Sequence, residues 1–379
     1  MAELFDQFRV RDIVIPNRIC VSPMSQYAAT HGYANDWHFS HLSRFALGGC
    51  GLIFTEATAI QKDARRTHGD LGLWTDGQIA RLRGIAEFIR AQGAVPGVQL
   101  AHAGRKASER RPWHGETPVD EEDIKIRNEY PWQGVGPTVE PYADGWPAPK
   151  EMTEDDIEEV IGEFGSAAKR ADMAEFDVIE VYAAHGFLLH QFYSPLSNTR
   201  TDKWGGDFAG RIRLPLEVAS SIRKYWPEEK PLFFRISATD WVSGGWDVKD
   251  SVKLAKALKE RGVDLIDCSS GGIGGESPAP KFPLAPAFQA DLASVVRWGA
   301  DISTMSVGLI WDAKLANELI ESGKADMVAL ARELLSNPNW ALHAAAELNV
   351  DDKFSMWKPE FGWWLNKRDR VITKLGLRK

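Results

Sequence analysis

The feature that most constrains the fold is a regular alternation of short apolar segments with longer segments of helical period. Eight apolar segments rich in β-branched residues are expected to be strands: Ile19–Val21, Leu52–Thr55, Val95–Leu100, Val178–Val181, Leu232–Ile236, Leu265–Cys268, Ile302–Val307 and Met327–Leu330. Each is a nearly continuous apolar run, which is typical of parallel strands that helices cover on both faces. The sequence therefore predicts an α/β fold built on a parallel sheet.

The segments between these strands have the spacing of amphipathic helices. Helices are predicted over Ile79–Arg90, Thr153–Ala171, Ser251–Glu260 and Ala313–Glu321. Thr153 with Asp156 three residues later matches a capping box, and Gly323 suits a left-handed helix end. Eight strands alternating with helices favour a (β/α)8 barrel, or TIM barrel, and an open doubly wound sheet is the alternative.

The positions of the polar residues favour the barrel. In a (β/α)8 barrel the functional groups follow the strands at one end of the cylinder, whereas an open sheet gathers them near one switch point. Here polar residues or glycines lie at or just after all eight predicted strands: Ser25, Glu56, Gln99 to His102, Tyr182 to His185, Arg235, Ser269 to Gly272, Gly308 and Arg332. We therefore expect a single TIM-barrel domain over residues 1–379.

One segment interrupts the alternation. Residues 104–150, after the third predicted strand, contain seven prolines and three tryptophans and show no clear period. Loops of this length are uncommon unless they serve a function. We expect a lid or substrate wall over the active-site face, and a surface loop without a catalytic role is the alternative.

Charge and composition narrow the range of partners. The 45 Lys and Arg residues against 53 Asp and Glu residues give a net charge of −8, which argues against a nucleic-acid partner. No run of about 18 apolar residues and no apolar signal segment occur, so we expect neither a membrane span nor secretion. Three cysteines without a CxxC pair indicate reduced thiols in a cytoplasmic protein and no structural zinc site. Metal binding by His185 with His190, or by His38 with His41, is disfavoured because neither pair has a carboxylate at ligand spacing.

The last two predicted strands end in residues that suit a phosphate. Val307 and Gly308 end one segment, and Ala331 and Arg332 follow the next. In barrels, the loops after the seventh and eighth strands often bind phosphate through backbone N–H groups, and an arginine adds a charge-assisted bond. A GxGxxG motif after the first strand is absent, which disfavours a Rossmann nicotinamide domain.

Polar side chains at three other strand ends suit a planar ligand that accepts electrons. Gln99 offers a donor and an acceptor to a heterocycle. Arg235 offers a permanent positive charge, which a ligand anion or an acidic neighbour such as Asp240 must balance. Tyr182 and His185 are placed to bond a ligand carbonyl, and a purely structural role for His185 is the alternative.

Six separated segments resemble one known family. They are IPNRICVSPMSQY (15–27), TEATAI (55–60), VQLAHAGRKAS (98–108), AAHGFLLHQFYSPLSNTRTDKWGG (183–206), FFRIS (233–237) and ALARELLSNPNW (329–340). In their order along the chain they are similar to the Old Yellow Enzyme family of flavin-dependent ene-reductases, particularly its xenobiotic-reductase-like (thermophilic-like) branch. Agreement over segments that span nearly the whole chain is far more specific than any single motif.

The resemblance implies one barrel domain that binds FMN without a covalent bond. By the family pattern the cofactor contacts form three groups: Pro23, Met24 and Ser25 along the ring, Ala57, Gln99 and Arg235 at its pyrimidine edge, and Val307, Gly308, Ala331 and Arg332 at the phosphate. Arg235 would favour the negatively charged reduced flavin.

The resemblance also implies a reaction in two halves. NAD(P)H gives a hydride to the flavin, and an electron-poor alkene such as an enone then takes the hydride at its β-carbon while an acid protonates its α-carbon. Tyr182 and His185 would bond the substrate carbonyl, and Tyr27 and Trp364 would form walls of the site. Trp364 would reach in from a neighbouring subunit, so a homo-oligomer with residues 350–379 as an interface segment is expected.

Three positions depart from the family pattern. Tyr182 stands for the usual first histidine of the carbonyl-binding pair, Phe187 for the usual proton-donating tyrosine, and Ser25 for a cysteine common in this branch. Solvent, Tyr182 or Tyr27 would then supply the proton, so reduction would be slower, and isomerisation of the alkene is an alternative outcome. A flavin-free barrel such as an aldolase, and a ligand-binding barrel without catalysis, are the remaining alternatives.

Overall fold

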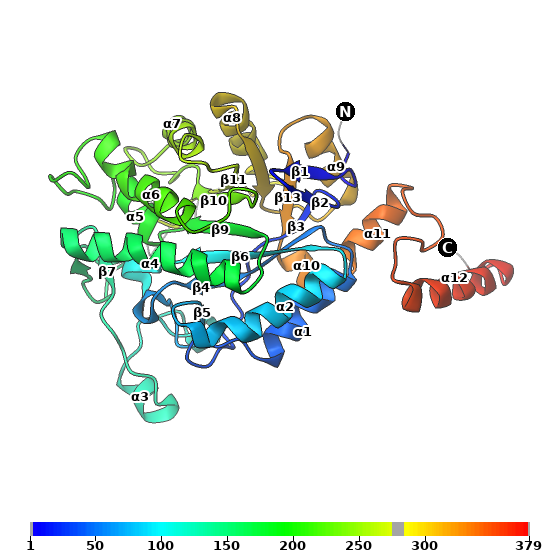
Figure 1. Cartoon of the computed structure of the whole chain (residues 1–379), viewed down its shortest axis with the longest axis horizontal. Helices are drawn as coiled ribbons and strands as arrows, with labels where there is room; N and C mark the ends of the chain where they lie inside the picture. Colours follow the sequence, from blue (N-terminus) through cyan, green and yellow to red (C-terminus); the bar gives the residue numbers. More distant parts are fainter. Residues whose placement is uncertain (1–2, 275–283, 378–379) are drawn as a thin grey trace.

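Eight parallel strands close into a barrel in the computed structural model, which describes residues 3–274 and 284–377 (Figure 1). The strands are β3 (Ile19–Val21), β4 (Leu52–Ala59), β6 (Val95–Ala101), β9 (Val178–Ala183), β10 (Leu232–Ser237), β11 (Leu265–Ser269), β12 (Ser303–Val307) and β13 (Met327–Leu330). Neighbours in the ring are neighbours along the chain, and the ring closes because β13 and β4 both pair with β3. The predicted (β/α)8 barrel is confirmed, and the open-sheet alternative is wrong.

Helices cover the outside of the barrel (Figure 1). They are α1 (Asp36–Leu47), α2 (Ile79–Ala91), α4 (Glu154–Met173), α5 (Leu188–Tyr193), α6 (Phe208–Arg223), α7 (Val248–Lys259), α8 (Ala290–Ala300), α9 (Ala313–Glu321), α10 (Arg332–Ser336) and α11 (Trp340–Glu347). All four predicted helices occur, and Thr153 and Asp156 make the expected capping box at the start of α4. Helix α7 begins at Val248 rather than Ser251, because the Asp247 side chain accepts hydrogen bonds from two backbone N–H groups of the first turn.

The inside of the barrel is apolar at the amino ends of the strands. A hairpin of β1 (Phe8–Val10) and β2 (Ile13–Ile15) packs at this end. Its Phe8 and Ile15 side chains belong to one buried cluster with the first inward residues of the strands, such as Leu265. The hairpin therefore plugs the base of the barrel, and any ligand must enter from the opposite end.

Gly97 on β6 makes room for the Phe54 ring in this apolar base. A Cβ at position 97 would lie 2.5 Å from two atoms of that ring, which is closer than real side chains approach. We expect Gly97→Ala to lower the free energy of unfolding by about 1–3 kcal/mol, because the added methyl group overpacks the barrel. Urea denaturation measures this change.

The matched control is Gly84→Ala on α2, where an added Cβ would meet nothing within 4 Å. There we expect the free energy of unfolding to rise by about 0.5–1 kcal/mol, since alanine favours a helix interior. Equal effects of the two substitutions would contradict the close packing of Gly97 against Phe54.

Alternate residues of β9, β10 and β11 point into the barrel and form three layers, because side chains two residues apart share one face of a strand. From the amino to the carboxyl ends, the layers are apolar (Val178, Phe233, Leu265), charged (Glu180, Arg235, Asp267) and polar (Tyr182, Ser237, Ser269). Burying charged side chains is costly unless they have partners or a function. The charged and polar layers therefore mark the end of the barrel where a site is expected.

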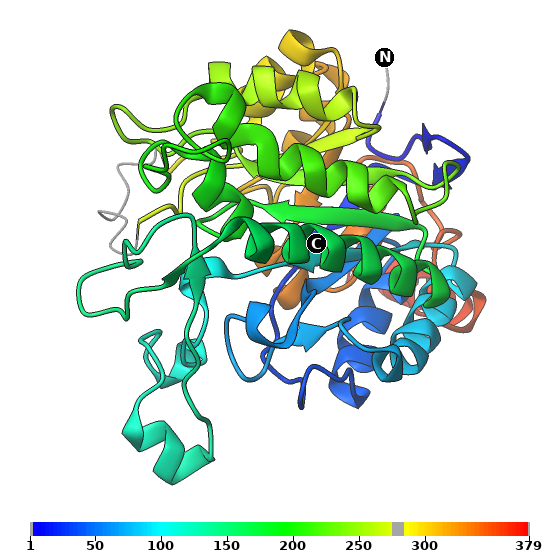
Figure 2. The ribbon, with the colours of Figure 1, turned by 60° about the vertical axis from the view of Figure 1, so that its left-hand side comes forward.

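Segment 104–150 has more regular structure than its sequence pattern indicated. It contains η3 (Gly104–Lys106), η4 (Pro112–His114), α3 (Glu121–Arg127), β7 (Val135–Gly136) and the start of β8 (Lys150–Glu151). Helix α3 lies at the tip, away from the barrel, at the lower left of Figure 2. The buried Asp123 carboxylate accepts hydrogen bonds from Arg110 and Arg127, which holds the tip together. A helix of seven residues is too short to show a clear period in the sequence.

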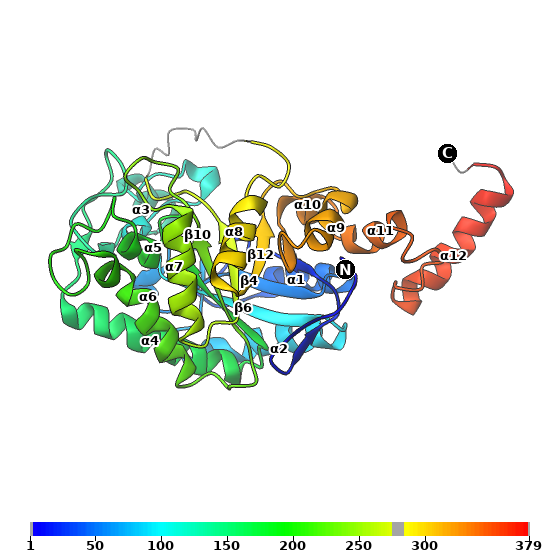
Figure 3. The ribbon, with the colours of Figure 1, turned by 90° about the horizontal axis from the view of Figure 1, so that it is seen from above.

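The last helix, α12 (Pro359–Lys374), stands beyond α11 and away from the barrel (Figure 3). Of its residues, all of which the structure describes, only Gly362 is buried. Phe361, Trp363 and Trp364 are exposed on it. This helix therefore presents large aromatic side chains that are only partly covered by the described parts of their own chain.

The three cysteines are buried and free, as the sequence predicts. Burial raises the pKa of the Cys50 thiol to about 12, so it stays protonated and unreactive at neutral pH. Among residues 3–274 and 284–377, no helix is both long and apolar enough to cross a membrane.

Candidate active site

Tyr182 and His185, the two residues predicted to bind a carbonyl, lie together at the carboxyl end of β9. The Tyr182 hydroxyl is 2.8 Å from His185 Nδ1, and His185 Nε2 is 2.5 Å from the Ser269 hydroxyl. The backbone of His185 is left-handed, with a φ of 53°, and its N–H donates to Ser237 Oγ at 2.9 Å. The hydrogen bond to Ser237 therefore fixes the turn after β9 in a conformation that places the His185 imidazole in hydrogen-bond contact with the Tyr182 hydroxyl.

Burial keeps both groups neutral. It raises the pKa of Tyr182 to about 12, so the phenol keeps its proton at neutral pH. Burial, followed by the positive charges of Arg235 and Lys106, lowers the pKa of His185 well below its usual value. A neutral imidazole has one donor and one acceptor nitrogen. When Ser269 donates to Nε2 and Nδ1–H donates to Tyr182, the phenol proton is left for a ligand.

Phe187, which stands where the family pattern has a proton-donating tyrosine, lies beside the Tyr182 ring. The two ring centroids are 4.1 Å apart and the planes meet at 32°. Phe187 belongs to a small buried cluster with Ala57, Ala101, Ala103 and Ala107. The Phe187 side chain is therefore an apolar wall that has no acidic proton to donate.

Arg235 is the cation of the charged layer. Its Nη1 donates to Ser22 Oγ at 2.7 Å, and its Nε lies 3.3 Å from Asp267 Oδ2. Gln99 donates to Glu180 at 2.8 Å. Burial and the nearby Asp267 raise the pKa of Glu180 well above its usual value, so Glu180 keeps its proton. Asp267 is then the carboxylate that balances the buried guanidinium.

The sequence suggested Asp240 as the acidic partner of Arg235, and this expectation is wrong. Asp267 is aligned with Arg235 across the β10–β11 pairing, whereas Asp240 lies in the loop beyond β10. Asp240 bonds His190 at 2.8 Å and Ser194 at 2.7 Å. Within the described parts of the chain, no three His, Cys, Asp or Glu side chains gather as a metal site requires.

The residues predicted to bind the ring of a flavin converge at the carboxyl ends of neighbouring strands. Ala57 is aligned with Gln99 across the β4–β6 pairing. Pro23, Met24 and Ser25 follow β3, the neighbour of β4, and are partly exposed. These positions therefore lie at the same end of the barrel, and they offer an amide, a hydroxyl and backbone groups.

The residues predicted to bind a phosphate follow two adjacent strands. Val307 of β12 is aligned with Ala329 of β13, so Gly308 and the Ala331–Arg332 pair come next at the same edge. Gly308 has a φ of 109°, a backbone conformation that favours glycine. The Arg332 side chain is exposed. Together with the buried Arg235, this arrangement fits a ligand that carries a phosphate at one end and gains negative charge at the other.

Tyr27 joins this site to segment 104–150. Its backbone is left-handed, with a φ of 55°, and its carbonyl oxygen accepts a hydrogen bond from Arg111 Nε at 3.1 Å. Its ring meets Trp113 edge to face, with centroids 5.6 Å apart. Burial raises the pKa of Tyr27 to about 12. Part of the segment therefore borders the site, and its use as a lid or wall stays a prediction.

Lys106 is a site residue that the sequence analysis missed. Its Nζ donates to the carbonyl oxygen of His185 at 3.0 Å and lies 4.6 Å from the ring centroid of Tyr142 and 5.9 Å from that of Phe187. Burial, followed by the charge of Arg66, lowers the pKa of Lys106 to about 7. A lysine just after an apolar strand, inside the segment VQLAHAGRKAS, was the available signal.

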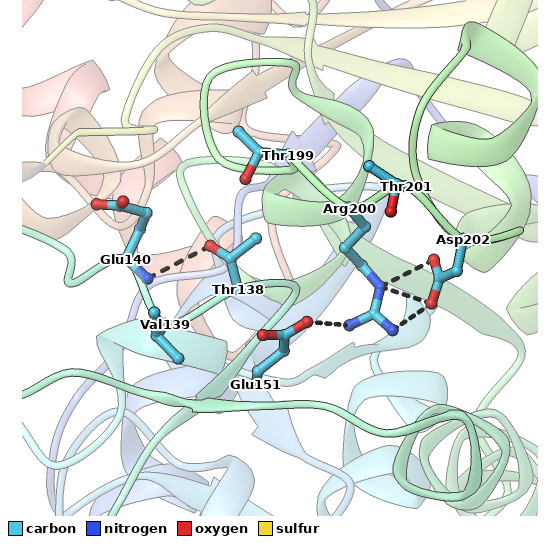
Figure 4. A pocket seen from close by; sticks show the side chains of 8 residues that line it. All are labelled: Thr138, Val139, Glu140, Glu151, Thr199, Arg200, Thr201 and Asp202. Carbon is cyan, nitrogen blue, oxygen red and sulfur yellow. Dashed lines mark hydrogen bonds and ion pairs between the residues drawn. The ribbon is translucent and has the colours of Figure 1, made fainter.

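A surface hollow of about 330 Å³ lies where segment 104–150 meets the loop after α5 (Figure 4). It is lined by Thr138, Val139, Glu140, Glu151, Thr199, Arg200, Thr201 and Asp202. The Arg200 guanidinium donates to the carbonyl oxygens of Pro137 and Met152 and pairs with two of the lining carboxylates. Because its donors are used within the protein, Arg200 braces the two loops and does not provide a second anion site.

Trp364, predicted as a wall of the substrate site, is not brought there by its own chain. It is 64% exposed on α12, and it borders a hollow with Arg44, Leu47 and Trp357. Its contribution to a site requires a second subunit, so this assignment stays a prediction.

Comparisons with known proteins agree on one family. Residues 3–351 match the family model described as the NADH:flavin oxidoreductase / NADH oxidase family. The chain is 42% identical over 366 residues to an NADH:flavin oxidoreductase of Gibberella zeae, covering 93% of this chain and 87% of that one. It is 42% identical over 362 residues to an NADPH dehydrogenase of Geobacillus sp. (strain WCH70), covering 95% and 98%. Among solved structures, morphinone reductase matches with a TM-score of 0.73 at 25% identity, covering 91% of this chain and 90% of that one.

Proposed function

This chain belongs to the NADH:flavin oxidoreductase / NADH oxidase family, and we propose that it reduces the C=C bond of electron-poor alkenes such as enones. The match confirms the resemblance to the Old Yellow Enzyme family, so the protein is an oxidoreductase with FMN as its cofactor and NAD(P)H as its reductant. The reduction of alkenes in particular is inferred from the residues of the site.

The observation that carries the proposal is the bonded pair of Tyr182 and His185 beside the charged layer. The oxygen of an enone gains negative charge when a hydride adds to the β-carbon. Buried donors aimed at such an oxygen contribute roughly 3–4 kcal/mol each to the stability of the transition state. Both side chains are neutral: the Tyr182 phenol keeps a proton for the carbonyl, and His185 orients that phenol through its Nδ1–H.

The residues at the strand ends fit FMN. Arg235 supplies a buried positive charge for a ring that gains electrons, and the side-chain oxygen of Gln99 has no hydrogen bond among the described residues and suits a ring N–H. We assign the remaining contacts as the resemblance implies them: Pro23, Met24, Ser25 and Ala57 at the ring, and Val307, Gly308, Ala331 and Arg332 at the phosphate. Bound there, FMN supplies the hydride that the alkene receives.

Absorption spectroscopy of the purified protein tests this function. We expect a yellow protein whose flavin band is bleached by NAD(P)H and restored by cyclohexenone, with the saturated ketone as product. Protein that bleaches but is reoxidised by no activated alkene would contradict ene-reduction. Colourless protein from riboflavin-rich cells would contradict the cofactor assignment.

The apolar wall at Phe187 supports a second candidate, alkene isomerisation. Without a proton for the α-carbon, the added hydride can leave again, and the double bond re-forms in the other geometry. A reductant deuterated at the transferred position separates the two outcomes. Reduction consumes it and places deuterium on the β-carbon of a saturated product, whereas isomerisation consumes none.

We also propose that the protein is a homo-oligomer in which Trp364 of one subunit closes the substrate site of another, with residues 350–379 at the interface. The exposed aromatic face of α12 supports this arrangement. Trp364→Ala is expected to raise the KM for the alkene by about tenfold, the effect of losing about 1.4 kcal/mol of contact. Steady-state kinetics with light scattering measures both properties.

The matched control is Trp298→Ala on α8, an exposed tryptophan on a different face of the barrel. It should leave both the KM and the molar mass unchanged. A monomeric protein, or a Trp364→Ala variant with the parental KM, would contradict the proposed role.

A further inference from the structure

The site has no phenol at position 187, but a second proton-carrying group lies beside that position. Lys106 is 7% exposed, and its ammonium lies 5.9 Å from the centroid of the Phe187 ring. It is also tied to the carbonyl-binding pair, because it donates to the backbone carbonyl oxygen of His185 at 3.0 Å. Lys106 therefore borders the wall where the family pattern has its acid.

Among residues 3–274 and 284–377, no carboxylate forms an ion pair with the Lys106 ammonium. Glu109, the carboxylate that attracts it most, is engaged by the guanidinium of Arg66 through both oxygens. The ammonium instead faces the ring of Tyr142 at 4.6 Å. Beyond the bond to His185, it makes no hydrogen bond within the part of the chain that the structure describes. A buried ammonium of this kind gives up a proton readily.

We propose that Lys106 is the acid that protonates the α-carbon of the alkene in this protein, an inference that rests on the proposed ene-reduction. The hydride adds to the β-carbon with its electron pair, and the π electrons move to the carbonyl oxygen as an enolate. The enolate pair then forms the α-carbon–hydrogen bond as one N–H bond of Lys106 breaks. The neutral amine regains a proton from water, and NAD(P)H supplies the two electrons consumed.

The proton affinity of Lys106 suits this role better than those of the phenols nearby. Its pKa is lowered to about 7 by burial, so the acid and its conjugate base are both populated near neutral pH. General acids work best when their pKa lies near the working pH. Burial raises the pKa values of Tyr27 and Tyr182 to about 12, which makes both phenols much weaker acids.

The pH dependence of the alkene-reducing step follows from this assignment. The charged and titratable groups that face Lys106 come from three parts of the chain. They are Arg66, just after η1 (Lys62–Ala64), then Arg105, Glu109, Glu116 and Tyr142 of segment 104–150, and His185 after β9. The ammonium form is lost as pH rises through about 7. The rate at which cyclohexenone reoxidises the reduced enzyme should therefore be constant below this pH and fall tenfold per unit above it. A rate that is flat between pH 6 and 9 would overturn the proposal.

Rapid-mixing kinetics of two variants distinguish proton donation by Lys106 from the effect of its positive charge. Lys106→Met keeps the length of the apolar stem, and Lys106→Arg keeps a positive charge that does not titrate near neutral pH. For both we expect bleaching by NADPH within twofold of the parent and reoxidation by cyclohexenone slower by at least about 10²-fold. Reoxidation of either variant by cyclohexenone at the parental rate would overturn the assignment. The control is Lys169→Met, an exposed lysine on α4, which should match the parent.

Restoring the phenol gives the complementary result. Phe187→Tyr in the Lys106→Met background should recover most of the lost rate and extend it to higher pH, because a phenol keeps its proton to about pH 10.

Competitive acetylation read by mass spectrometry measures the titration of Lys106 without any turnover. A midpoint near the ordinary pKa of a lysine would also overturn the proposal. If the parent enzyme reduces no alkene, the proposed function fails. If the parent and both Lys106 variants reduce alkenes equally, only the present inference fails.

Discussion

Tyr182→Phe is expected to lower the rate of alkene reduction by roughly 10²- to 10³-fold, the usual cost of removing one donor from an oxyanion site. The substitution removes only the hydroxyl that lies 2.8 Å from His185 Nδ1 and keeps the ring that packs on Phe187. The reductive half of the reaction does not develop charge on a substrate carbonyl, so bleaching by NADPH should stay near the parental rate. Stopped-flow measurement of the two halves separates these effects.

Tyr225→Phe is the matched control, because Tyr225 is 52% exposed after α6 and its hydroxyl is remote from the barrel end. It should leave both rates unchanged. An unchanged rate of enone reduction in Tyr182→Phe would contradict the assignment of Tyr182 as a carbonyl donor.

Arg235→Met should destabilise the flavin-free protein by about 3–5 kcal/mol, because it leaves a carboxylate buried without its cation. Arg235 is 8% exposed and Asp267 is fully buried, so water cannot replace the lost partner. The variant should also lose most of its bound flavin, since the positive charge beside the ring is gone. Urea denaturation followed by tryptophan fluorescence measures the first effect, and the flavin absorbance per protein measures the second.

The double variant Arg235→Met with Asp267→Asn is the control for this prediction. Removing both charges together should recover much of the stability, and the difference measures the coupling between the two groups. Arg81→Met removes an exposed ion pair with Asp36 and should change stability by less than about 0.5 kcal/mol. Equal destabilisation in the single and double variants would contradict the Arg235–Asp267 pairing.

The barrel could be predicted because burial on both faces leaves a clear pattern in each strand. β10 is buried at all six positions, and its sequence LFFRIS is apolar except where Arg235 and the last serine point inward. The missed helix α3 has no such pattern. Its only buried residue is the polar Asp123, and its helix depends on the Asp120 cap and on arginine contacts to Asp123. Local patterns predict elements that pack on the core, and fail for elements held by polar contacts.

Site residues that lie close together in the sequence could be predicted. Those that come into contact only across the barrel could not. Tyr182 and His185 are three residues apart, so one segment revealed both. The pairing of Arg235 with Asp267 depends on the register between two strands, which no sequence pattern displays. Lys106 escaped notice for a similar reason, because its burial arises when distant parts of segment 104–150, including Tyr142, fold back over it.

The pairing of β3 with β13 determines when the barrel can close during synthesis of the chain. Val21 is aligned with Leu330, so the first and last strands of the ring meet only after both they and the six strands between them have been synthesised. Until then the nascent sheet carries an unpaired edge on each side, and such edges invite association with other chains. The Leu4 N–H donates to Asn317 Oδ1, and Phe8 of the hairpin shares a buried cluster with Met327, so other contacts also join these two parts of the chain. The barrel therefore closes only once β13 is available to pair with β3.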